Sequence, residues 1–254
     1  MSGAPLPFQG KTVLVTGAGS GIGLAIARQF LREGASIVAE DINPEVEQTF
    51  AGDERVAILV ADAGKEESAI QAVELARLRF GRLDVLVNNA ARIVYKSAVE
   101  TTLEDWNSIM DVTSTGVFLH SREALKVMMP NRSGSIVNIG SYACFQSFSG
   151  ISAYAAAKGA LAQITRTLAL EAIPYGIRVN GIGAGDVVTN LLNSFRQDGR
   201  DFLRQHGTNA PIKRAAQPEE IAEIAAFLAS DKASFIVGSI LMADGGMSIA
   251  VPTQ

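Results

Sequence analysis

The sequence predicts an α/β fold in which a doubly wound parallel sheet carries helices on both faces. Segments typical of strands alternate with segments typical of helices along the 254 residues, and such alternation implies parallel strands joined by right-handed helical crossovers. The expected strands are apolar on both sides, as Val85, Leu86 and Val87 illustrate, because both faces of such a sheet are covered. No internal repeat, low-complexity tract or linker interrupts residues 1–254, so we expect a single domain.

Four strands and three helices are expected in the first half of the chain. Gly21–Glu33 carries apolar residues on a helical period, and Glu66–Phe80 predicts a helix that ends at Gly81. A short helix is expected after Asn43-Pro44, a typical pair for a cap and a first helical position. Short apolar runs predict the strands at residues 11–16, 35–40, 56–61 and 83–88.

Three further strands and three helices are expected in the second half. Leu103–Met129 is predicted to be mostly one helix that Pro130 ends, because proline does not continue a helix. Ser152–Ile173 is predicted to be a second long helix, and Pro218–Ala229 the last one. The strands are predicted at residues 135–140, 177–182 and 235–242, and residues around 188–210 are expected to form a mobile lid.

The composition argues against several classes of function. The net charge is −4, from 22 basic and 26 acidic residues, without a Lys/Arg cluster, so nothing suggests nucleic acid as a partner. Cys144 is the one cysteine, which excludes an internal disulfide and fits a reducing compartment. Residues 1–10 do not resemble a secretory signal, and no apolar run reaches the length of about 20 residues that a membrane helix needs. We therefore expect a cytoplasmic protein without a membrane partner.

Polar residues and glycines directly follow most of the expected strands. In open parallel sheets the ligand lies beyond the carboxyl ends of the strands. This rule places six residues on one rim: Gly17, Asp41, Asp62, Asn89, Ser141 and Gly185. The sequence thus predicts one ligand site at this edge of the sheet.

A glycine-rich loop, TGAGSGIG at Thr16–Gly23, joins the first expected strand to the first expected helix. Such a loop brings backbone amides and a helix N-terminus close to a pyrophosphate. A glycine cluster can also make an ordinary turn, but its place between a strand and a helix favours a dinucleotide.

Asp41 ends the second expected strand, where an acidic residue accepts hydrogen bonds from the adenosine ribose hydroxyls. A carboxylate there would repel a 2′-phosphate, and neither the glycine loop nor Ile42, Asn43 and Pro44 offers a cation. These residues predict NAD rather than NADP as the cofactor. The preceding Glu40 is expected to face the other side of the strand.

The spacing of three residues, Ser141, Tyr154 and Lys158, suggests acid–base chemistry. Tyr154 and Lys158 lie one turn apart on the same expected helix, and Ser141 follows an expected strand. An unperturbed tyrosine has a pKa of about 10, and a nearby ammonium would lower that pKa. The phenol would then donate or accept a proton near physiological pH.

With these motifs, the chain resembles the short-chain dehydrogenase/reductase family over essentially its whole length. The residues that carry the resemblance are Thr16–Gly23, Asp62, NNA at Asn88–Ala90, Ser141, Tyr154, Lys158, RVN at Arg178–Asn180, Gly185, Thr189 and DGG at Asp244–Gly246. The combination is specific, and it implies a Rossmann-like sheet of seven strands and hydride transfer with a nicotinamide cofactor.

The resemblance also implies roles for the matching residues. Tyr154 would act as the general acid or base, Lys158 would lower its pKa and bind the nicotinamide ribose, and Ser141 would hold the substrate oxygen. Asp62 would approach the adenine, Asn89 the central part of the cofactor, and Thr189 its carboxamide end. The cofactor-binding candidates are Gly17, Ser20, Gly21, Ile22, Gly23, Asp41, Asp62, Asn89, Tyr154, Lys158 and Thr189.

Three positions depart from the family pattern. Ala91 replaces the glycine of NNAG, Ala184 replaces the proline before Gly185, and Thr113 stands where the family usually has an asparagine. In the usual account that asparagine lies at a helix kink and supports a water chain to the lysine. Threonine can bond back to a carbonyl one turn earlier and so bend a helix, and an active enzyme is the preferred interpretation.

Three stretches are expected to form the substrate wall, namely Arg92–Tyr95, Cys144–Phe148 and Leu191–Asn209. Apolar lining is expected from Phe145, Phe148, Leu191, Leu192 and Phe195. Arg92 could bind an anionic group, although a solvated surface arginine is at least as common. Cys144 is expected to be an unreactive residue of the substrate wall rather than a nucleophile. His206 is expected on the lid surface, and no cluster of metal-ligating residues suggests a metal site.

The sequence therefore predicts an NAD-dependent oxidoreductase that acts on a secondary alcohol or ketone, with a sugar, polyol or cyclic alcohol as candidates. An NADPH-dependent 3-oxoacyl thioester reductase and a non-catalytic NAD-binding scaffold are the alternatives. The resemblance also implies a homotetramer or homodimer built on the helices expected at 103–129 and 152–173.

Overall fold

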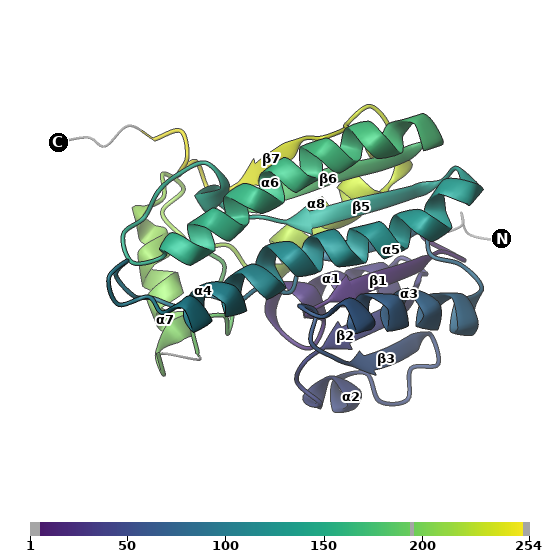
Figure 1. The fold of residues 1–254 in the computed structure, drawn as a ribbon, viewed down its shortest axis with the longest axis horizontal. Coiled ribbons are helices and arrows are strands. Elements are labelled where there is room, and N and C mark those ends of the chain that lie inside the picture. Colours follow the sequence, from purple (N-terminus) through teal and green to yellow (C-terminus); the bar gives the residue numbers. More distant parts are fainter. Residues whose placement is uncertain (1–5, 194–195, 251–254) are drawn as a thin grey trace.

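Seven parallel strands form one sheet in the order β3-β2-β1-β4-β5-β6-β7 (Figure 1). This computed structural model describes residues 6–193 and 196–250. The strands are β1 Thr12–Thr16, β2 Ser36–Asp41, β3 Val56–Val60, β4 Val85–Asn88, β5 Gly134–Ile139, β6 Ile177–Ala184 and β7 Ile240–Ala243. The order changes direction between β1 and β4, where a doubly wound sheet opens a crevice. The predicted fold class is confirmed.

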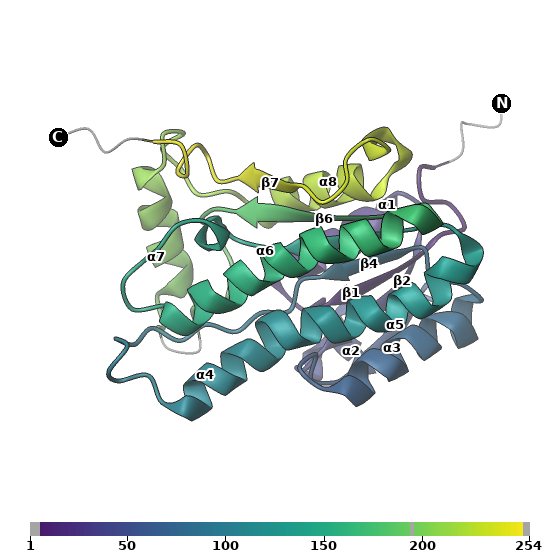
Figure 2. The same cartoon turned by 45° about the horizontal axis from the view of Figure 1, so that its top comes forward.

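Helices connect successive strands and lie on both faces of the sheet (Figure 2). They are α1 Gly21–Arg32, α2 Glu45–Thr49, α3 Glu66–Phe80, α4 Leu103–Met110, α5 Gly116–Asn131, α6 Ser152–Ala172, α7 Gly199–His206 and α8 Pro218–Ala229. Figure 2 shows α5 and α6 lying side by side across the sheet, with α3 next to α5.

Two apolar clusters hold the layers together. Val13 and Val15 of β1 point into the cluster that contains Ile26 of α1 and Ile221 of α8. Leu14, between them in sequence, belongs to the opposite cluster, which α3, α5 and α6 cover. Successive side chains of a strand point to opposite faces, so the continuous apolar runs of the sequence fill both layers.

The predicted helix over 103–129 differs from the structure in two ways. Residues Asp111–Thr115 form a π-helical turn between α4 and α5, so the helix is interrupted in its middle. Pro130 does not end α5, which runs to Asn131. Arg132 adopts a left-handed conformation with φ 50° and terminates the helix there instead. Proline disfavours further helix because it lacks an N–H and crowds the preceding turn, and α5 continues for only one residue beyond Pro130.

The last strand is shorter than the predicted segment 235–242. It begins at Ile240, and the preceding residues form a loop. Gly238 has φ +69°, which is incompatible with strand geometry. The amide side chain of Asn180 fixes this loop, because it donates to Ile236 O at 2.8 Å and accepts from Ser239 N at 3.0 Å.

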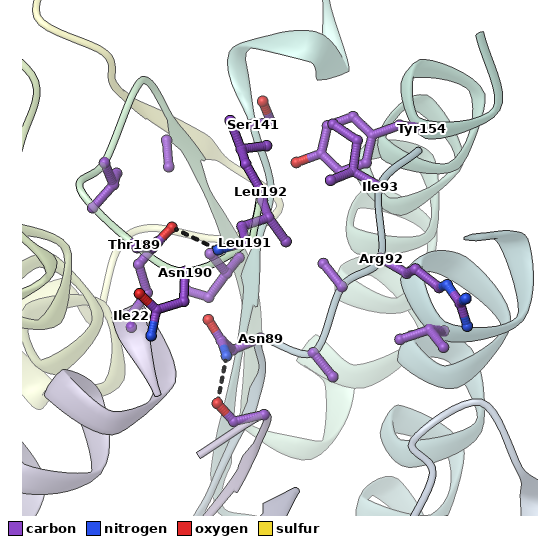
Figure 3. Close-up of a pocket in the computed structure, with 18 of the residues that line it drawn as sticks. Ile22, Asn89, Arg92, Ile93, Ser141, Tyr154, Thr189, Asn190, Leu191 and Leu192 are labelled. Carbon is purple, nitrogen blue, oxygen red and sulfur yellow. Dashed lines mark hydrogen bonds between the residues drawn. The ribbon is translucent and has the colours of Figure 1, made fainter. Parts of the chain in front are cut away.

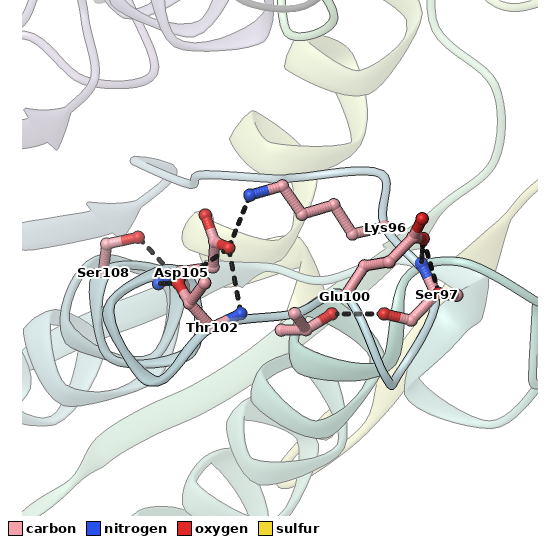
Figure 4. A network of polar contacts seen from close by, with 7 residues as sticks. Lys96, Ser97, Glu100, Thr102, Asp105 and Ser108 are labelled. Carbon is pink, nitrogen blue, oxygen red and sulfur yellow. Dashed lines mark hydrogen bonds and ion pairs between the residues drawn. The ribbon is translucent and has the colours of Figure 1, made fainter.

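Polar contacts fix the end of the connection from β4 to α4 (Figure 4), whereas Ile93, nearer β4, packs in an apolar cluster. Thr102 accepts from Asp105 N, and the Asp105 carboxylate accepts from Thr102 N, which closes a capping box at the start of α4. Lys96 reaches the same carboxylate at 2.6 Å. These contacts lower the pKa of Asp105 to about 2, chiefly through the hydrogen bond from Lys96. These contacts fix the segment that follows Arg92, Ile93 and Tyr95, three residues of the cavity described below.

Candidate active site

A cavity of about 530 Å³ lies at the carboxyl ends of the strands. Its volume lies within the range of about 300–1,000 Å³ that small-molecule and cofactor sites occupy. All six residues predicted on the rim line it: Gly17, Asp41, Asp62, Asn89, Ser141 and Gly185. The rule that ligands bind beyond the carboxyl ends of parallel strands therefore located the cavity correctly.

The glycine loop has the geometry that only glycines accept. Gly17 and Gly21 have φ +67° and +53°, in the left-handed region that other residues rarely adopt. Gly23 does not line the cavity, but a Cβ there would lie 2.0 Å from Gly17 O. The first turn of α1 can therefore approach the end of β1 closely, and Ser20, Gly21 and Ile22 reach the cavity wall.

Asp41 is fixed at the edge of the cavity by two backbone amides. Its Oδ2 accepts from Gly19 N at 2.8 Å, and its Oδ1 accepts from Asn43 N at 2.9 Å. Each carboxylate oxygen can accept a further hydrogen bond, so both remain available to a ligand. Glu40 points to the opposite side, as predicted, and its buried carboxylate contacts His120 Nε2 at 2.8 Å.

The other cofactor candidates also line the cavity. Asp62 Oδ1 accepts from Gly64 N at 2.9 Å, which orients the carboxylate after β3. The side chain of Asn89 donates to Thr16 O at 3.0 Å and to Gly17 O at 3.1 Å, so it joins β4 to the glycine loop. Thr189 lies against Gly21, and its hydroxyl accepts from Leu191 N at 3.4 Å (Figure 3).

Ser141, Tyr154 and Lys158 meet in the cavity although they come from β5 and α6. Figure 3 shows the phenol of Tyr154 pointing toward the end of β5, where Ser141 lies. Lys158 Nζ is 5.6 Å from the centre of the Tyr154 ring and donates to Ile139 O at 2.7 Å. The three residues are buried, with 7%, 8% and 2% of their surface exposed. A phenol, a hydroxyl and an ammonium group thus share one water-poor pocket.

Burial determines the proton affinities of this group. It raises the pKa of Tyr154 well above the usual value, while a hydrogen bond with Ser141 opposes that rise. It lowers the pKa of Lys158 to about 8, because the ammonium loses its hydration. The prediction that a nearby ammonium gives Tyr154 a net decrease in pKa is therefore wrong for this structure. Lys158 nevertheless remains mostly protonated at pH 7.

The three departures from the family pattern are accommodated locally. Thr113 is fully buried in the π-helical turn, and its hydroxyl accepts from Arg92 N at 3.1 Å. Ser114, not Thr113, makes the bond back to a carbonyl one turn earlier, to Met110 O at 2.9 Å. Ala91 and Ala184 line the cavity without closing it.

The predicted substrate wall is partly correct. Arg92, Phe148, Leu191 and Leu192 line the cavity, and Figure 3 shows the Arg92 side chain pointing away from Ser141 and Tyr154. Phe145 does not line it. That side chain is 51% exposed and lies beneath the guanidinium of Arg166 at 5.3 Å, because the loop turns outward after Cys144.

Other expectations for the wall have different outcomes. Phe195 lies outside the described residues. Cys144 is partly buried beside Ser141, and its Sγ accepts from Ser141 N at 3.5 Å. His206 is not simply a surface residue, because it lines the cavity and pairs with Asp186 at 2.8 Å.

Tyr142 and Asp186 also line the cavity, although they were not among the predicted site residues. Asp186 directly follows Gly185, and Tyr142 directly follows Ser141. Both are polar residues that follow a strand by two or three positions. The rule that ligands bind beyond the carboxyl ends of parallel strands therefore covers them as well.

The described residues hold neither a group of metal-ligating side chains nor a helix fit to cross a membrane. Across residues 6–193 and 196–250, no three His, Cys, Asp or Glu side chains are grouped so that they could hold a metal ion. In the same ranges, no helix combines the length and the apolar character that crossing a membrane requires.

Known proteins match the chain over nearly its full length. A family model described as enoyl-(acyl carrier protein) reductase matches residues 17–248. An uncharacterized oxidoreductase of Thermotoga maritima is 38% identical over 94% of this chain and 98% of its own. The meso-2,3-butanediol dehydrogenase of Serratia marcescens is 37% identical over 94% of this chain and 95% of its own. A 3-oxoacyl-(acyl-carrier-protein) reductase of Thermotoga maritima is 33% identical over 95% of this chain and 99% of its own.

Solved structures agree with this. Levodione reductase superposes with a TM-score of 0.89 at 34% identity and covers 96% of this chain and 100% of its own. The aldohexose dehydrogenase of Thermoplasma acidophilum, in ligand-free form, gives the same TM-score of 0.89 at 30% identity, with 99% of both chains covered. The shared seven-stranded sheet and these near-complete matches together show that the chain belongs to the short-chain dehydrogenase/reductase family of oxidoreductases, enzymes that act on CH–OH groups.

Proposed function

We propose that this protein transfers a hydride between NAD(H) and a secondary alcohol or its ketone. One observation carries the proposal: Ser141, Tyr154 and Lys158, brought together from two elements, are buried in the cavity that the glycine loop also borders. The fold alone would not support a reaction, since function depends on the site. A bound nicotinamide cofactor would supply the hydride acceptor or donor.

The protein's own residues would move the proton. In the oxidation direction, Ser141 and Tyr154 would hold the alcohol oxygen, and Tyr154 would accept its proton. Since burial raises the pKa of Tyr154, this transfer needs a positive charge close to the phenol. Lys158 would provide it: its Nζ lies 5.6 Å from the ring centre, and its pKa of about 8 leaves it mostly protonated at pH 7.

The carboxylate of Asp41 supports NAD over NADP. Its two oxygens are held by Gly19 N and Asn43 N, so the group cannot easily turn away from a ligand. Arg92 and Lys158 are the arginine and lysine among the described residues that line the cavity. They belong to the β4 end and to α6, and β4 is two strands, about 10 Å, away from β2. A 2′-phosphate beside Asp41 would therefore meet negative charge without a neighbouring cation.

Several relatives are named for neutral hydroxylated or carbonyl substrates, and a further one is named for gluconate, a polyhydroxylated acid. Butanediol, levodione and an aldohexose are named for three of the matching proteins. We infer that a sugar, polyol or cyclic alcohol is the substrate class here.

Four further expectations stay predictions: a homotetramer or homodimer, a mobile lid around 188–210, a single domain and a cytoplasmic location. A mass measurement in solution tests the oligomeric state.

A 3-oxoacyl thioester reductase that uses NADPH is the second candidate. The 33% identity to a 3-oxoacyl-(acyl-carrier-protein) reductase favours it. The fixed carboxylate of Asp41 argues against it, because that enzyme class would require room for the 2′-phosphate of NADPH.

Turnover on a panel of substrates tests the proposal. With NAD, we expect oxidation of secondary alcohols, diols and cyclic alcohols, followed by the absorbance of NADH. Reduction of a 3-oxoacyl thioester with NADPH, without any alcohol oxidation, would favour the second candidate and contradict the first.

A further inference from the structure

A carboxylate, an imidazole and a phenol meet in the cavity beside the proposed reaction centre. Asp186 follows β6, His206 is the last residue of α7, and Tyr142 directly follows Ser141. All three line the same cavity as Ser141 and Tyr154. We refer to Asp186, His206 and Tyr142 as the distal polar group.

Asp186 is the centre of this group. Its side chain is only 9% exposed, and its Oδ2 contacts His206 Nδ1 at 2.8 Å, a normal hydrogen-bond distance. Its other oxygen, Oδ1, accepts from the hydroxyl of Tyr142 at 3.4 Å. Hydrogen bonds from a hydroxyl usually measure about 2.5–3.0 Å, so Oδ1 is under-bonded. A buried carboxylate oxygen with one weak donor gains most from a ligand that brings a second donor.

His206 is held in one orientation by its neighbours. Its ring stacks on Phe202 with the centroids 5.6 Å apart and the planes at 24°. The Nδ1 atom faces Asp186, and a hydrogen bond to a carboxylate requires a hydrogen on that nitrogen. Nε2 is then the ring atom left to meet a ligand, on a side chain that is 37% exposed.

The surroundings of the distal polar group are mostly apolar, and Arg196, which lies over the Phe202 ring at 4.0 Å, is paired with Asp198. Phe148 packs edge-on against Tyr142, with the ring centroids 4.8 Å apart, and Leu192 and Phe202 belong to the apolar cluster beside the cavity. Burial and the carboxylate of Asp186 both raise the pKa of Tyr142, which keeps its phenol protonated as a donor. In such surroundings a hydroxyl is a good partner for Asp186, whereas a carboxylate or phosphate would be repelled.

We propose that the distal polar group, with Asp186 at its centre, binds a second oxygen function of the substrate, so that the enzyme prefers neutral diols and hydroxyketones to simple alcohols. This rests on the proposed function, in which Tyr154 and Ser141 hold the reacting oxygen. Asp186 would accept a hydrogen bond from the second hydroxyl, and His206 would orient Asp186. The three residues would determine specificity and take no part in hydride transfer.

Matched substrate pairs test this inference. The pairs are 2,3-butanediol with 2-butanol and 1,2-cyclohexanediol with cyclohexanol, each oxidised with NAD. We expect kcat/KM to be about 10- to 100-fold higher for each diol, the range for one hydrogen bond to a charged group. In Asp186→Ala this ratio should fall to about 1, because the second hydroxyl of the diol loses its acceptor.

Two further variants separate recognition from folding. His206→Gln keeps an N–H donor toward Asp186 and should retain most of the ratio, whereas His206→Leu should lose it. Asp201→Ala is the matched control, because Asp201 lies on the same helix as His206 with its side chain 77% exposed. It should leave the ratio unchanged, and NADH affinity reports whether each variant keeps its fold.

The outcomes are distinguishable. A ratio near 1 in the unaltered protein, or a high ratio that Asp186→Ala leaves intact, would overturn the inference while the proposed function stands. Turnover of neither member of any pair would contradict the proposed function itself, and the inference with it.

Discussion

Replacing Tyr154 with phenylalanine is expected to reduce kcat by about 10²- to 10⁴-fold, the usual contribution of a positioned general acid or base. The substitution keeps the ring and removes only the hydroxyl, the group that would exchange a proton with the substrate. The ring is buried, with 8% of its surface exposed. Because phenylalanine keeps the packing of this ring, the fold should be retained. Steady-state rates with NAD and an alcohol substrate measure the effect.

Tyr175→Phe is the matched control for this prediction. Tyr175 precedes β6, at the opposite end of the strands from the cavity, and is 40% exposed. It should leave kcat unchanged, and both variants should bind NADH as the unaltered protein does. If Tyr154→Phe retained substantial turnover, another residue would have to carry the proton.

Replacing Gly23 with alanine is expected to damage the cofactor site from outside the cavity. A Cβ at this position would lie 2.0 Å from Gly17 O and 2.5 Å from Asn89 Nδ2. The backbone of the glycine loop cannot yield without moving α1 away from β1. We expect the free energy of unfolding to fall by about 1–3 kcal/mol and NADH affinity to fall by about tenfold or more. Denaturant unfolding and a fluorescence titration measure the two effects.

Gly159→Ala tests whether any glycine-to-alanine change would do the same. Gly159 lies inside α6, next to Lys158, and a Cβ there meets no atom within 4 Å. Alanine is favoured over glycine within a helix by about 0.5–1 kcal/mol, so this variant should be slightly more stable. A Gly23→Ala protein that bound NADH normally would contradict the close packing of the glycine loop.

The fold could be predicted from the sequence because each layer follows from a local pattern. The apolar runs of β1 and β4 pair in the middle of the sheet, and the rim residues follow from strand direction alone. The interruption at Asp111–Thr115 could not be predicted in this way. It accompanies tertiary contacts, since a Cβ at Gly116 would lie 2.3 Å from Ala63 O and Thr113 bonds to Arg92 N.

Electrostatic properties of the site were harder to predict than its position. The spacing of Tyr154 and Lys158 indicated their proximity, but the pKa of Tyr154 depends on how far water is excluded. Burial of that kind results from the packing of α6 on β6 and from the loop after β6, whose Leu192 belongs to the same apolar cluster as Tyr154. The pairing of Asp186 with His206 likewise joins two residues 20 positions apart, which no local pattern encodes.

The selection of NAD by Asp41 is the claim on which the proposed function most depends. Fluorescence titrations of the pure protein with NADH and with NADPH test it most directly. We predict that NADH binds clearly more tightly, because the carboxylate held by Gly19 N and Asn43 N accepts ribose hydroxyls and repels a 2′-phosphate. Equal or tighter binding of NADPH would contradict this role of Asp41 and would favour the thioester reductase.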